Sequence, residues 1–478
     1  MMKSVLKPLI CASSLLALSA CTMAPRYERP VAPVALDQVE QAATQAADIG
    51  WRDFYQNQQL QTLIEQALDN NRDLRVAALT VEQVRAQYRI QRAQLLPSIN
   101  VTGSGTRQRV AEAVSETGES YIAEQYTAGV GIAAYELDLF GRVQSLKNAA
   151  LERYLATDEA RKSAQLSLVA EVADAYFTWV ANTELKSLAD STLQARQDSY
   201  DMVRQRYESG LASELDLSQA ATALHTARVD AALYQRQLAI SFTALEVLVG
   251  TPLNSQNIQV ASFEEVMLTD LPTTVTSDVL LQRPDILQAE YNLRAANANI
   301  GAARAAFFPR ISLTGSYGNA SRELDNLFDS GTRAWSFTPQ VTLPIFAWGA
   351  NAANLDVARL QKDVNIAVYE KTIQTAFKEV RDSLLSQSTL DAQLAAQQDL
   401  VTAAARSYEL AQLRYERGVD SYLDVLDSQR SLNQAQQALI SMRLAKSRNQ
   451  LTLYKALGGG LREGSTDTQI SQVGFIVR

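Results

Sequence analysis

The side chains with the most distinctive chemistry in this sequence are two aspartates near its end. Asp424 and Asp427 are three residues apart, and Leu423 and Arg430 flank them. Residues three or four positions apart are neighbours on a helix surface, so Asp427 shares a helix face with Leu423 and is also a near neighbour of Asp424. If three copies of the chain surrounded one axis, each aspartate would form a ring of carboxylates. Such rings repel one another and attract cations, so the pattern predicts a constriction.

Each aspartate also has a structural explanation. Asp424 follows Ser421 by three residues, which is the spacing of a helix capping box, and for Asp424 capping and gating both stay open. Asp427 is too far along the helix for that box, and its alternative is an ordinary solvated face. Asp427 is therefore the better single candidate for a gate.

Catalytic chemistry is not expected. His225 is the only histidine, which removes most histidine-based catalysis and most histidine metal sites. The sequence shows no nucleophile–base set, phosphate loop or metal-ligand spacing. The net charge of −8 and the lack of a basic cluster with interleaved aromatic residues argue against nucleic-acid binding. We therefore expect no enzyme, no metal and no cofactor other than a covalent lipid.

That lipid is expected at the N-terminus, where both cysteines of the chain lie, Cys11 and Cys21. Two lysines precede an apolar stretch too short to span a bilayer. The segment Leu18–Cys21 then resembles the cleavage site of a bacterial lipoprotein signal. This predicts removal of residues 1–20 and a lipid, including palmitate, on Cys21. In such signals Thr22 favours the outer membrane. An ordinary signal peptide cut nearby is the alternative.

The rest of the chain is a tandem duplication. Arg206–Asp216 recurs as Arg414–Asp424 at an offset of 208 residues, and Leu95–Gly103 recurs as Phe307–Gly315 at an offset of 212. Each repeat therefore carries one strand signal and one helical tip signal. The predicted segments are a lipid-anchored extended segment at 21–56, a first repeat at 57–250, a linker at 251–278, a second repeat at 279–457 and a tail at 458–478.

Two kinds of pattern alternate within each repeat. Polar and apolar residues alternate at about 97–138 and 308–346, which predicts a β-hairpin in each repeat. Arg142–Ser209 and Ala350–Arg417 contain no proline or glycine. As helices, with a rise of about 1.5 Å per residue, each would reach roughly 100 Å, which suggests coiled-coil packing. The fold is thus predicted to be mainly α with a small β part.

Each long helix is predicted to turn back at the duplicated motif, in tips at about 206–216 and 414–424. Gly210 and Gly418 stand where a left-handed residue commonly ends a helix. The residues expected to cap the helices that follow are Ser213 and Ser421.

The four strands of one chain cannot stand alone in a membrane. Outside the signal segment no apolar run reaches about 18 residues, so the strands are the only spanning candidates. Open edges would leave backbone groups unpaired in hydrocarbon. Three chains would give twelve strands, enough to enclose water, and their helical hairpins would form a periplasmic duct below. A soluble β-sandwich segment is the alternative.

Several motifs together resemble the outer membrane factor family, the TolC-like and especially the OprM-like lipoprotein channels of tripartite efflux pumps. The motifs that carry this resemblance, besides the two tips, are Leu68–Leu74, Tyr135–Arg142, Arg283–Ile286 and Phe308–Gly315.

The resemblance implies a homotrimer in the outer membrane lipids, with a twelve-stranded barrel on a helical periplasmic tunnel. It places the segments 22–56, 250–278 and 458–478 in an equatorial belt. The implied function is a passive exit duct for drugs and other small molecules. A periplasmic adaptor and an inner-membrane transporter of the resistance–nodulation–division type are the implied partners.

The resemblance also implies roles for the tips. Leu423, Asp427 and Arg430 match gate positions of OprM-like members, and Asp424 and Asp427 match the constriction of TolC-like ones. Arg414 and Tyr415 could hold the closed state through hydrogen bonds to a neighbouring helix, or could simply pack the hairpin. The residues expected to contact the adaptor, or merely to form the turns, are Tyr207, Gly210, Leu211, Ser213, Gly418, Val419 and Ser421.

Three other functions stay open. TolC-like ducts also serve type I protein secretion. Metal efflux is a second alternative, although the mature chain has few methionines and one histidine to form a soft-metal path. A non-transporting coiled-coil lipoprotein scaffold is the third, and it leaves the alternating strands unexplained.

Overall fold

The structure is a computed structural model that describes residues 22–33, 49–116, 118–254, 262–263, 266, 268–269, 271 and 281–464. The predicted signal peptide, Cys21, most of the predicted linker and the end of the predicted tail lie outside the described residues. The chain forms two units, and each takes residues from both repeats. The first unit comprises Met1–Val31, Thr80–Thr157 and Gln288–Tyr369, and the second comprises Ala32–Leu79, Asp158–Leu287 and Glu370–Arg478.

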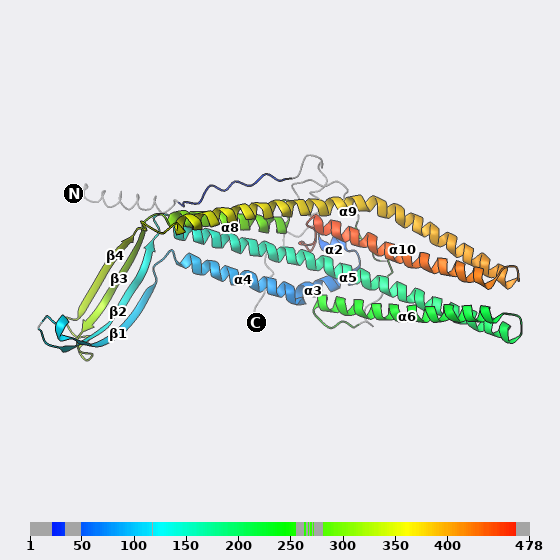
Figure 1. The fold of residues 1–478 in the computed structure, drawn as a ribbon, viewed down its shortest axis with the longest axis horizontal. Helices are drawn as coiled ribbons and strands as arrows, with labels where there is room; N and C mark the ends of the chain where they lie inside the picture. Colours follow the sequence, from blue (N-terminus) through cyan, green and yellow to red (C-terminus); the bar gives the residue numbers. More distant parts are fainter. Residues whose placement is uncertain are drawn as a thin grey trace. The chain divides into compact units, whose positions relative to one another are not determined.

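A four-stranded antiparallel sheet in the order β1–β2–β3–β4 belongs to the first unit (Figure 1). Pairing of β1 with β2 and of β3 with β4 gives the two predicted hairpins. Pairing of β2 with β3, with Gly129 opposite Gly318, joins the two repeats. The bounds are Ile99–Val110 for β1, Glu112–Val114 for the short helix η2, Tyr121–Leu137 for β2, Arg310–Ser321 for β3 and Arg333–Thr342 for β4.

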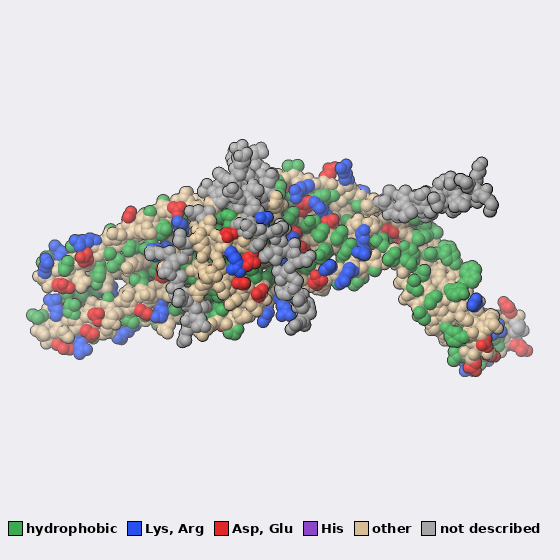
Figure 2. Space-filling model, turned by 180° about the vertical axis from the view of Figure 1, so that it is seen from behind, with side chains coloured by type: hydrophobic (Ala, Val, Ile, Leu, Met, Phe, Trp, Pro, Cys, Tyr) green, Lys and Arg blue, Asp and Glu red, His purple; other side chains and the backbone are tan. Residues whose placement is uncertain are grey.

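The strands leave many large apolar side chains exposed, as Figure 2 shows over the sheet. Trp335 is 75% exposed, Phe337 60% and Val341 63%. The apolar alternation was expected to continue to Ile345, but β4 ends at Thr342. Thr342 pairs with Arg310, the first residue of β3, and Pro309 precedes Arg310, so the ladder ends at this pair.

Two helices of 67 residues each contribute residues to both units, α5 from Arg142 to Glu208 and α9 from Ala350 to Glu416. Each ends one residue before the position predicted from the lack of proline and glycine. The other long helices are α4 (Arg72–Ala93), α6 (Glu214–Val249), α8 (Pro284–Ala305) and α10 (Tyr422–Ala456). None of the helices in the described part of the chain has a stretch long and apolar enough to cross a membrane.

An aromatic core in the second unit corrects the expectation that residues 21–56 are extended throughout. Trp51–Phe54 form the short helix α2, and Trp51 and Phe54 are both buried. The Phe54 ring stacks on Tyr454 with ring centroids 3.9 Å apart. Trp51 and Phe54 are three residues apart, so a single helical turn can bury both aromatic side chains, and their burial stabilises that turn. The next helix, α3, spans Gln58–Asn70.

A break at Asn71 divides the helical stretch that follows Asn57 into the two helices α3 and α4. Asn71 has an extended backbone, with ψ 130°. Its side-chain oxygen accepts a hydrogen bond from the Leu74 N–H at 2.9 Å, and its amide donates to the Leu248 carbonyl at 2.9 Å. An asparagine that caps a new helix and donates to a carbonyl in the last turn of α6 outweighs the apolar periodicity.

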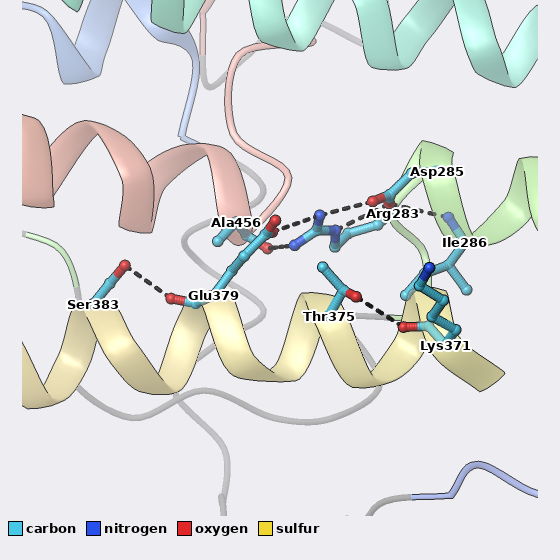
Figure 3. Close-up of polar contacts among 8 residues, drawn as sticks. All are labelled: Arg283, Asp285, Ile286, Lys371, Thr375, Glu379, Ser383 and Ala456. Atoms are coloured by element: carbon cyan, nitrogen blue, oxygen red, sulfur yellow. Dashed lines mark hydrogen bonds and ion pairs between the residues drawn. The ribbon is translucent and has the colours of Figure 1, made fainter. Parts of the chain in front are cut away.

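Arg283 joins three helices of the second unit just before α8 begins (Figure 3). Its guanidinium binds the Asp285 carboxylate at 2.8 Å and the Glu379 carboxylate of α9 at 2.9 Å. It also donates to the Ala456 carbonyl at the end of α10 at 3.1 Å. Arg283 is 8% exposed, so these bonds compensate a buried charge.

Candidate functional site at the helical tips

The two tips that join α5 to α6 and α9 to α10 have the same backbone design. Gly210 has φ +73° and Gly418 has φ +74°. The Leu211 N–H donates to the Arg206 carbonyl at 2.7 Å, and the Gly210 N–H donates to the Tyr207 carbonyl at 2.9 Å. This is a Schellman motif, which needs a left-handed residue. The second tip has the same two hydrogen bonds. The Val419 N–H donates to the Arg414 carbonyl and the Gly418 N–H donates to the Tyr415 carbonyl, each at 2.9 Å.

A serine and an aspartate cap the helix after each tip. The Asp216 carboxylate accepts from the Ser213 N–H at 3.0 Å and from the Ser213 hydroxyl at 2.8 Å. The Asp424 carboxylate accepts from the Ser421 N–H at 3.2 Å and from the Ser421 hydroxyl at 2.7 Å. Asp424 therefore has the capping role that its spacing allowed, and within one chain its carboxylate is engaged.

The tips differ in what their arginines bind. Arg414 donates two hydrogen bonds to Asp420 in its own tip, one of them at 2.7 Å, and holds the pKa of that carboxyl below its ordinary value. The first tip has Ala212 where the second has Asp420. Arg206, which corresponds to Arg414, instead lies over the Tyr415 ring at 5.0 Å. Arg206 thus reaches from one hairpin to the other.

A small core joins the hairpins just behind the tips. Val203 and Ala220 of the first hairpin are buried together with Tyr422 and Val425 of the second. The Tyr415 and Tyr422 rings are 5.4 Å apart. Further apolar side chains pack against this core, namely those of Tyr200, Leu217, Tyr408, Ala411 and Leu426. Tyr415 therefore packs the hairpins together, which was one of its two predicted roles, and Arg414 bonds inside its own tip.

The remaining gate candidates lie on the surface of α10. Leu423 is 58% exposed. Asp427 pairs with Arg430 three residues on at 2.5 Å, and both side chains are more than half exposed. An exposed ion pair of this kind adds little to the stability of the fold. Leu423, Asp427 and Arg430 are therefore accessible for a second role, such as lining a constriction.

The predicted adaptor-contact residues are accessible to different degrees. Leu211 is 72% exposed, Val419 60% and Tyr207 40%. A Cβ built on Gly210 or Gly418 would meet no atom within 4 Å, so the space around both glycines is open.

Arg206 and Asp420 were not predicted as functional residues from the sequence. The signal was available, because Ala212 and Asp420 occupy matching places in otherwise similar motifs. The distance between Arg206 and Tyr415 could not have been read from a pattern, since more than 200 residues separate them.

Among the residues that the structure describes, no three His, Cys, Asp or Glu side chains gather into a possible metal site.

A second polar cluster holds the start of the described chain in the first unit. Residues 22–33, here termed the N-terminal strap, contain no helix or strand. Glu290 of α8 is 3% exposed and accepts hydrogen bonds from Arg29 at 3.0 Å, Arg294 at 3.1 Å and Tyr27 at 3.3 Å. Burial alone would raise the pKa of Glu290, but the hydrogen bonds from the two arginines hold it below its ordinary value.

The strap follows one face of α8. Residues 290, 294, 297, 301 and 304 are three or four apart, so they share that face. At Gly301 an added Cβ would lie 2.6 Å from the Ala24 nitrogen, so only glycine lets the strap come so close. The other contacts pair Asn297 with the Pro25 carbonyl (2.8 Å), Arg304 with the Met23 carbonyl (3.2 Å) and Ser145 of α5 with Thr22 (2.9 Å).

Comparison with known protein families identifies the family to which this chain belongs. The model of the family described as outer membrane efflux protein matches residues 63–251 and 275–459. The chain belongs to this family. The resemblance drawn from the sequence motifs is confirmed, and the protein is an outer membrane efflux channel component rather than a member of an enzyme family.

Named relatives agree over almost the full length. The toluene efflux pump outer membrane protein TtgC and the antibiotic efflux pump outer membrane protein ArpC, both of Pseudomonas putida, are each 50% identical over 464 residues, which is 95% of this chain and 96% of theirs. The open-state crystal structure of the MtrE outer membrane channel of Neisseria gonorrhoeae superposes with a TM-score of 0.84 at 41% identity. That match covers 94% of this chain and 100% of MtrE.

Proposed function

We propose that three copies of this chain form a passive exit duct that is gated at the helical tips. Each copy contributes its four strands to a twelve-stranded barrel in the outer membrane and its helical hairpins to a periplasmic tunnel. A periplasmic adaptor and an inner-membrane transporter of the resistance–nodulation–division type supply the cargo and the energy.

The sheet supports assembly from several copies. In the described part of one chain, β1 and β4 are edge strands, and each pairs on one side alone. Their exposed aromatic and aliphatic side chains suit lipid. Pairing β4 of one copy with β1 of the next would remove both edges, which hydrocarbon requires.

The proposed gate lies at the tips. The observation behind it is that Leu423 and Asp427, four residues apart on α10, are both exposed. A threefold axis near α10 would turn both residues into rings that narrow the tunnel and attract cations. Arg430 pairs with Asp427 and would set the charge of that ring. Tyr207, Leu211 and Val419 offer the exposed contacts that an adaptor would bind.

The relatives' names support small molecules as cargo, since those proteins serve toluene and antibiotic efflux pumps. This favours small-molecule efflux over type I protein secretion for the present chain. We further propose that Cys21, which lies outside the described residues, carries the covalent lipid and adds a second membrane anchor.

Deletion of the gene from its bacterium tests the proposed function. The deletion strain should become more sensitive to antibiotics and toluene, and the wild-type gene should restore tolerance. Gly418→Val, which forces a branched side chain into a left-handed position, should reach the outer membrane but fail to restore tolerance. Unchanged tolerance combined with lost secretion of a protein would instead support type I secretion.

A further inference from the structure

Where α10 packs on α5 away from the tips, its arginines are paired with carboxylates. Arg448 binds the Asp174 carboxylate at 2.6 Å. Arg443 lies 4.0 Å from the Glu184 carboxylate. These side chains are still partly exposed to water, and a cation that is buried more deeply between helices needs a counter-charge even more.

Arg196 of α5, closer to the tips, is a buried cation without a carboxylate partner. It is 8% exposed, and its Nη1 has no hydrogen-bond partner. Its titratable neighbours are the phenols of Tyr408 and Tyr422, and burial lowers the pKa of Arg196. No carboxylate in the described part of the chain pairs with it. A buried charge without a counter-charge is destabilising, so this position favours an anion that the chain itself does not supply.

A groove beside Arg196 has room for such an anion. It has a volume of about 730 Å³ and lies between α5, α6 and α10, and Arg196 is part of its lining. Three amide side chains of α10, those of Asn433, Gln434 and Gln437, line it as well. Each carries an NH₂ group that can donate hydrogen bonds to an anion.

The other charges of the groove favour a ligand with a single negative charge. Arg430 lines the groove but pairs with Asp427 at 2.5 Å. Asp230 of α6 also lines it and is not among the groups that act on Arg196. Burial and the neighbouring Asp230 carboxylate raise the pKa of Tyr234, one turn further along α6. Asp230 would repel a second negative charge on a ligand.

Apolar side chains also line the groove, so a bound molecule can have an apolar part. Leu215 of α6 and Leu423 of α10 line it and are 66% and 58% exposed. A ligand that covered them would remove apolar surface from water, which favours binding. The lining thus offers one unpaired cation, neutral hydrogen-bond donors and an apolar surface.

We propose that this groove binds a small organic monoanion, a carboxylate on an apolar body. The carboxylate lies toward Arg196 and accepts hydrogen bonds from the amides of α10, and the apolar body covers Leu215 and Leu423. A carboxylate that neutralises a guanidinium forms a strong, charge-assisted contact. The site belongs to a single chain and goes beyond the proposed duct, on which it does not depend.

Titration with para-fluorobenzoate, followed by the fluorine NMR signal of the probe, tests this site in the purified full-length protein in a non-ionic detergent. The wild type should bind it about tenfold or more tightly than para-fluorobenzamide, which has the same ring without the charge. Arg196→Met should weaken binding of para-fluorobenzoate by about tenfold or more. Arg196→Lys keeps the charge and should weaken it less. Arg448→Met, the matched control, removes a paired arginine outside the groove and should leave the affinity unchanged.

A variant that fills the groove tests where the probe binds. Ala223 of α6 lines the groove, so Ala223→Phe should abolish binding while the charge of Arg196 stays in place. Ala405→Phe adds the same ring at an exposed position of α9 and should bind like the wild type. The probe should raise the melting temperature of the wild type but not that of Ala223→Phe or Arg196→Met. Because these two variants change different helices, misfolding of one leaves the other as a test.

Three results would overturn the site. They are equal affinity for para-fluorobenzoate and para-fluorobenzamide, unchanged affinity in Arg196→Met, and unchanged affinity in Ala223→Phe. Failure of the proposed function would be distinguishable from these results. A protein that conducts no current but binds the probe through Arg196 would contradict the duct and leave the anion site standing.

Discussion

Two arginines at matching places in the repeats make different bonds. Arg414 binds Asp420 in its own tip, whereas Arg206, whose tip has Ala212 in place of the aspartate, lies over Tyr415 of the other hairpin. A cation above an aromatic ring is attracted by about 0.5–1 kcal/mol at an exposed site. One residue difference between the repeats thus accompanies a change from a bond within a tip to a contact between hairpins.

Arg206→Ala should therefore favour separation of the tips. Loss of about 0.5–1 kcal/mol would raise the ratio of open to closed channels roughly two- to fivefold. Open probability in planar bilayers measures this ratio. Arg414→Ala is the control, since it removes the corresponding side chain but no contact between hairpins, and equal effects of the two variants would contradict the assignment.

Single residues were predictable where a local pattern decides their role. The three-residue spacing of Ser421 and Asp424 was enough to suggest the capping bonds that the structure shows. The contact of Arg206 with Tyr415 depends instead on how two hairpins pack, and no spacing along the chain reports that distance.

Among the elements, the N-terminal strap and α8 depend on each other. The strap has no helix or strand, and contacts along one face of α8 hold it in place. The buried Glu290 is the centre of these contacts, and without the strap it would keep Arg294 but lose Arg29 and Tyr27. The strap begins at Thr22, the residue that follows Cys21, the predicted lipid acceptor.

Glu290→Gln should loosen the strap. The loss of two charge-assisted contacts at a buried site should lower the free energy of unfolding by about 1–3 kcal/mol. Chemical denaturation monitors this change, and limited proteolysis within residues 22–33 monitors release of the strap. Glu82→Gln on the exposed face of α4 is the control, and equal effects of the two changes would contradict a special role for Glu290.

The contribution of Glu290 should depend on pH in a defined direction. Its pKa is lowered in the folded chain, so its stabilisation is fully present above the ordinary glutamate value of about 4.3. The stabilisation is lost as the pH falls through the lower folded pKa. The stability difference between wild type and Glu290→Gln should therefore be constant near neutrality and should shrink in acid. A difference that grew in acid would contradict this pairing.

The long elements were more predictable than the short ones. The absence of proline and glycine located α5 and α9 to within a residue, because nothing interrupts their backbone hydrogen bonds. The break at Asn71 and the short helix α2 escaped prediction, since both depend on partners distant in sequence, Leu248 and Tyr454.

For the whole molecule, the duplication explains the fold better than a division into consecutive domains. Each repeat supplies one hairpin to the sheet and one helical hairpin with a tip, so each spatial unit contains parts of both repeats. The duplication also gives two similar tips. The gate candidates Leu423, Asp427 and Arg430 follow the second of them.

Cys21→Ser should remove the lipid without abolishing assembly, because the strands provide a separate anchor in the proposed trimer. Labelling with radioactive palmitate and fractionation of membranes measure the two properties. The variant should lose the label but remain in the outer membrane as a trimer. Complete loss from the outer membrane despite normal synthesis would show that the anchors are not independent.

Single-channel recording in planar bilayers tests the gated duct most directly. Purified wild-type protein should give discrete conductance steps, and Leu423→Ala/Asp427→Ala should raise the conductance or the open probability. The matched control is Leu215→Ala/Gln219→Ala, which alters the corresponding positions of the first repeat and should behave like the wild type. No conductance from any of these proteins would contradict the duct, and a double variant indistinguishable from wild type would contradict a gate at Leu423 and Asp427.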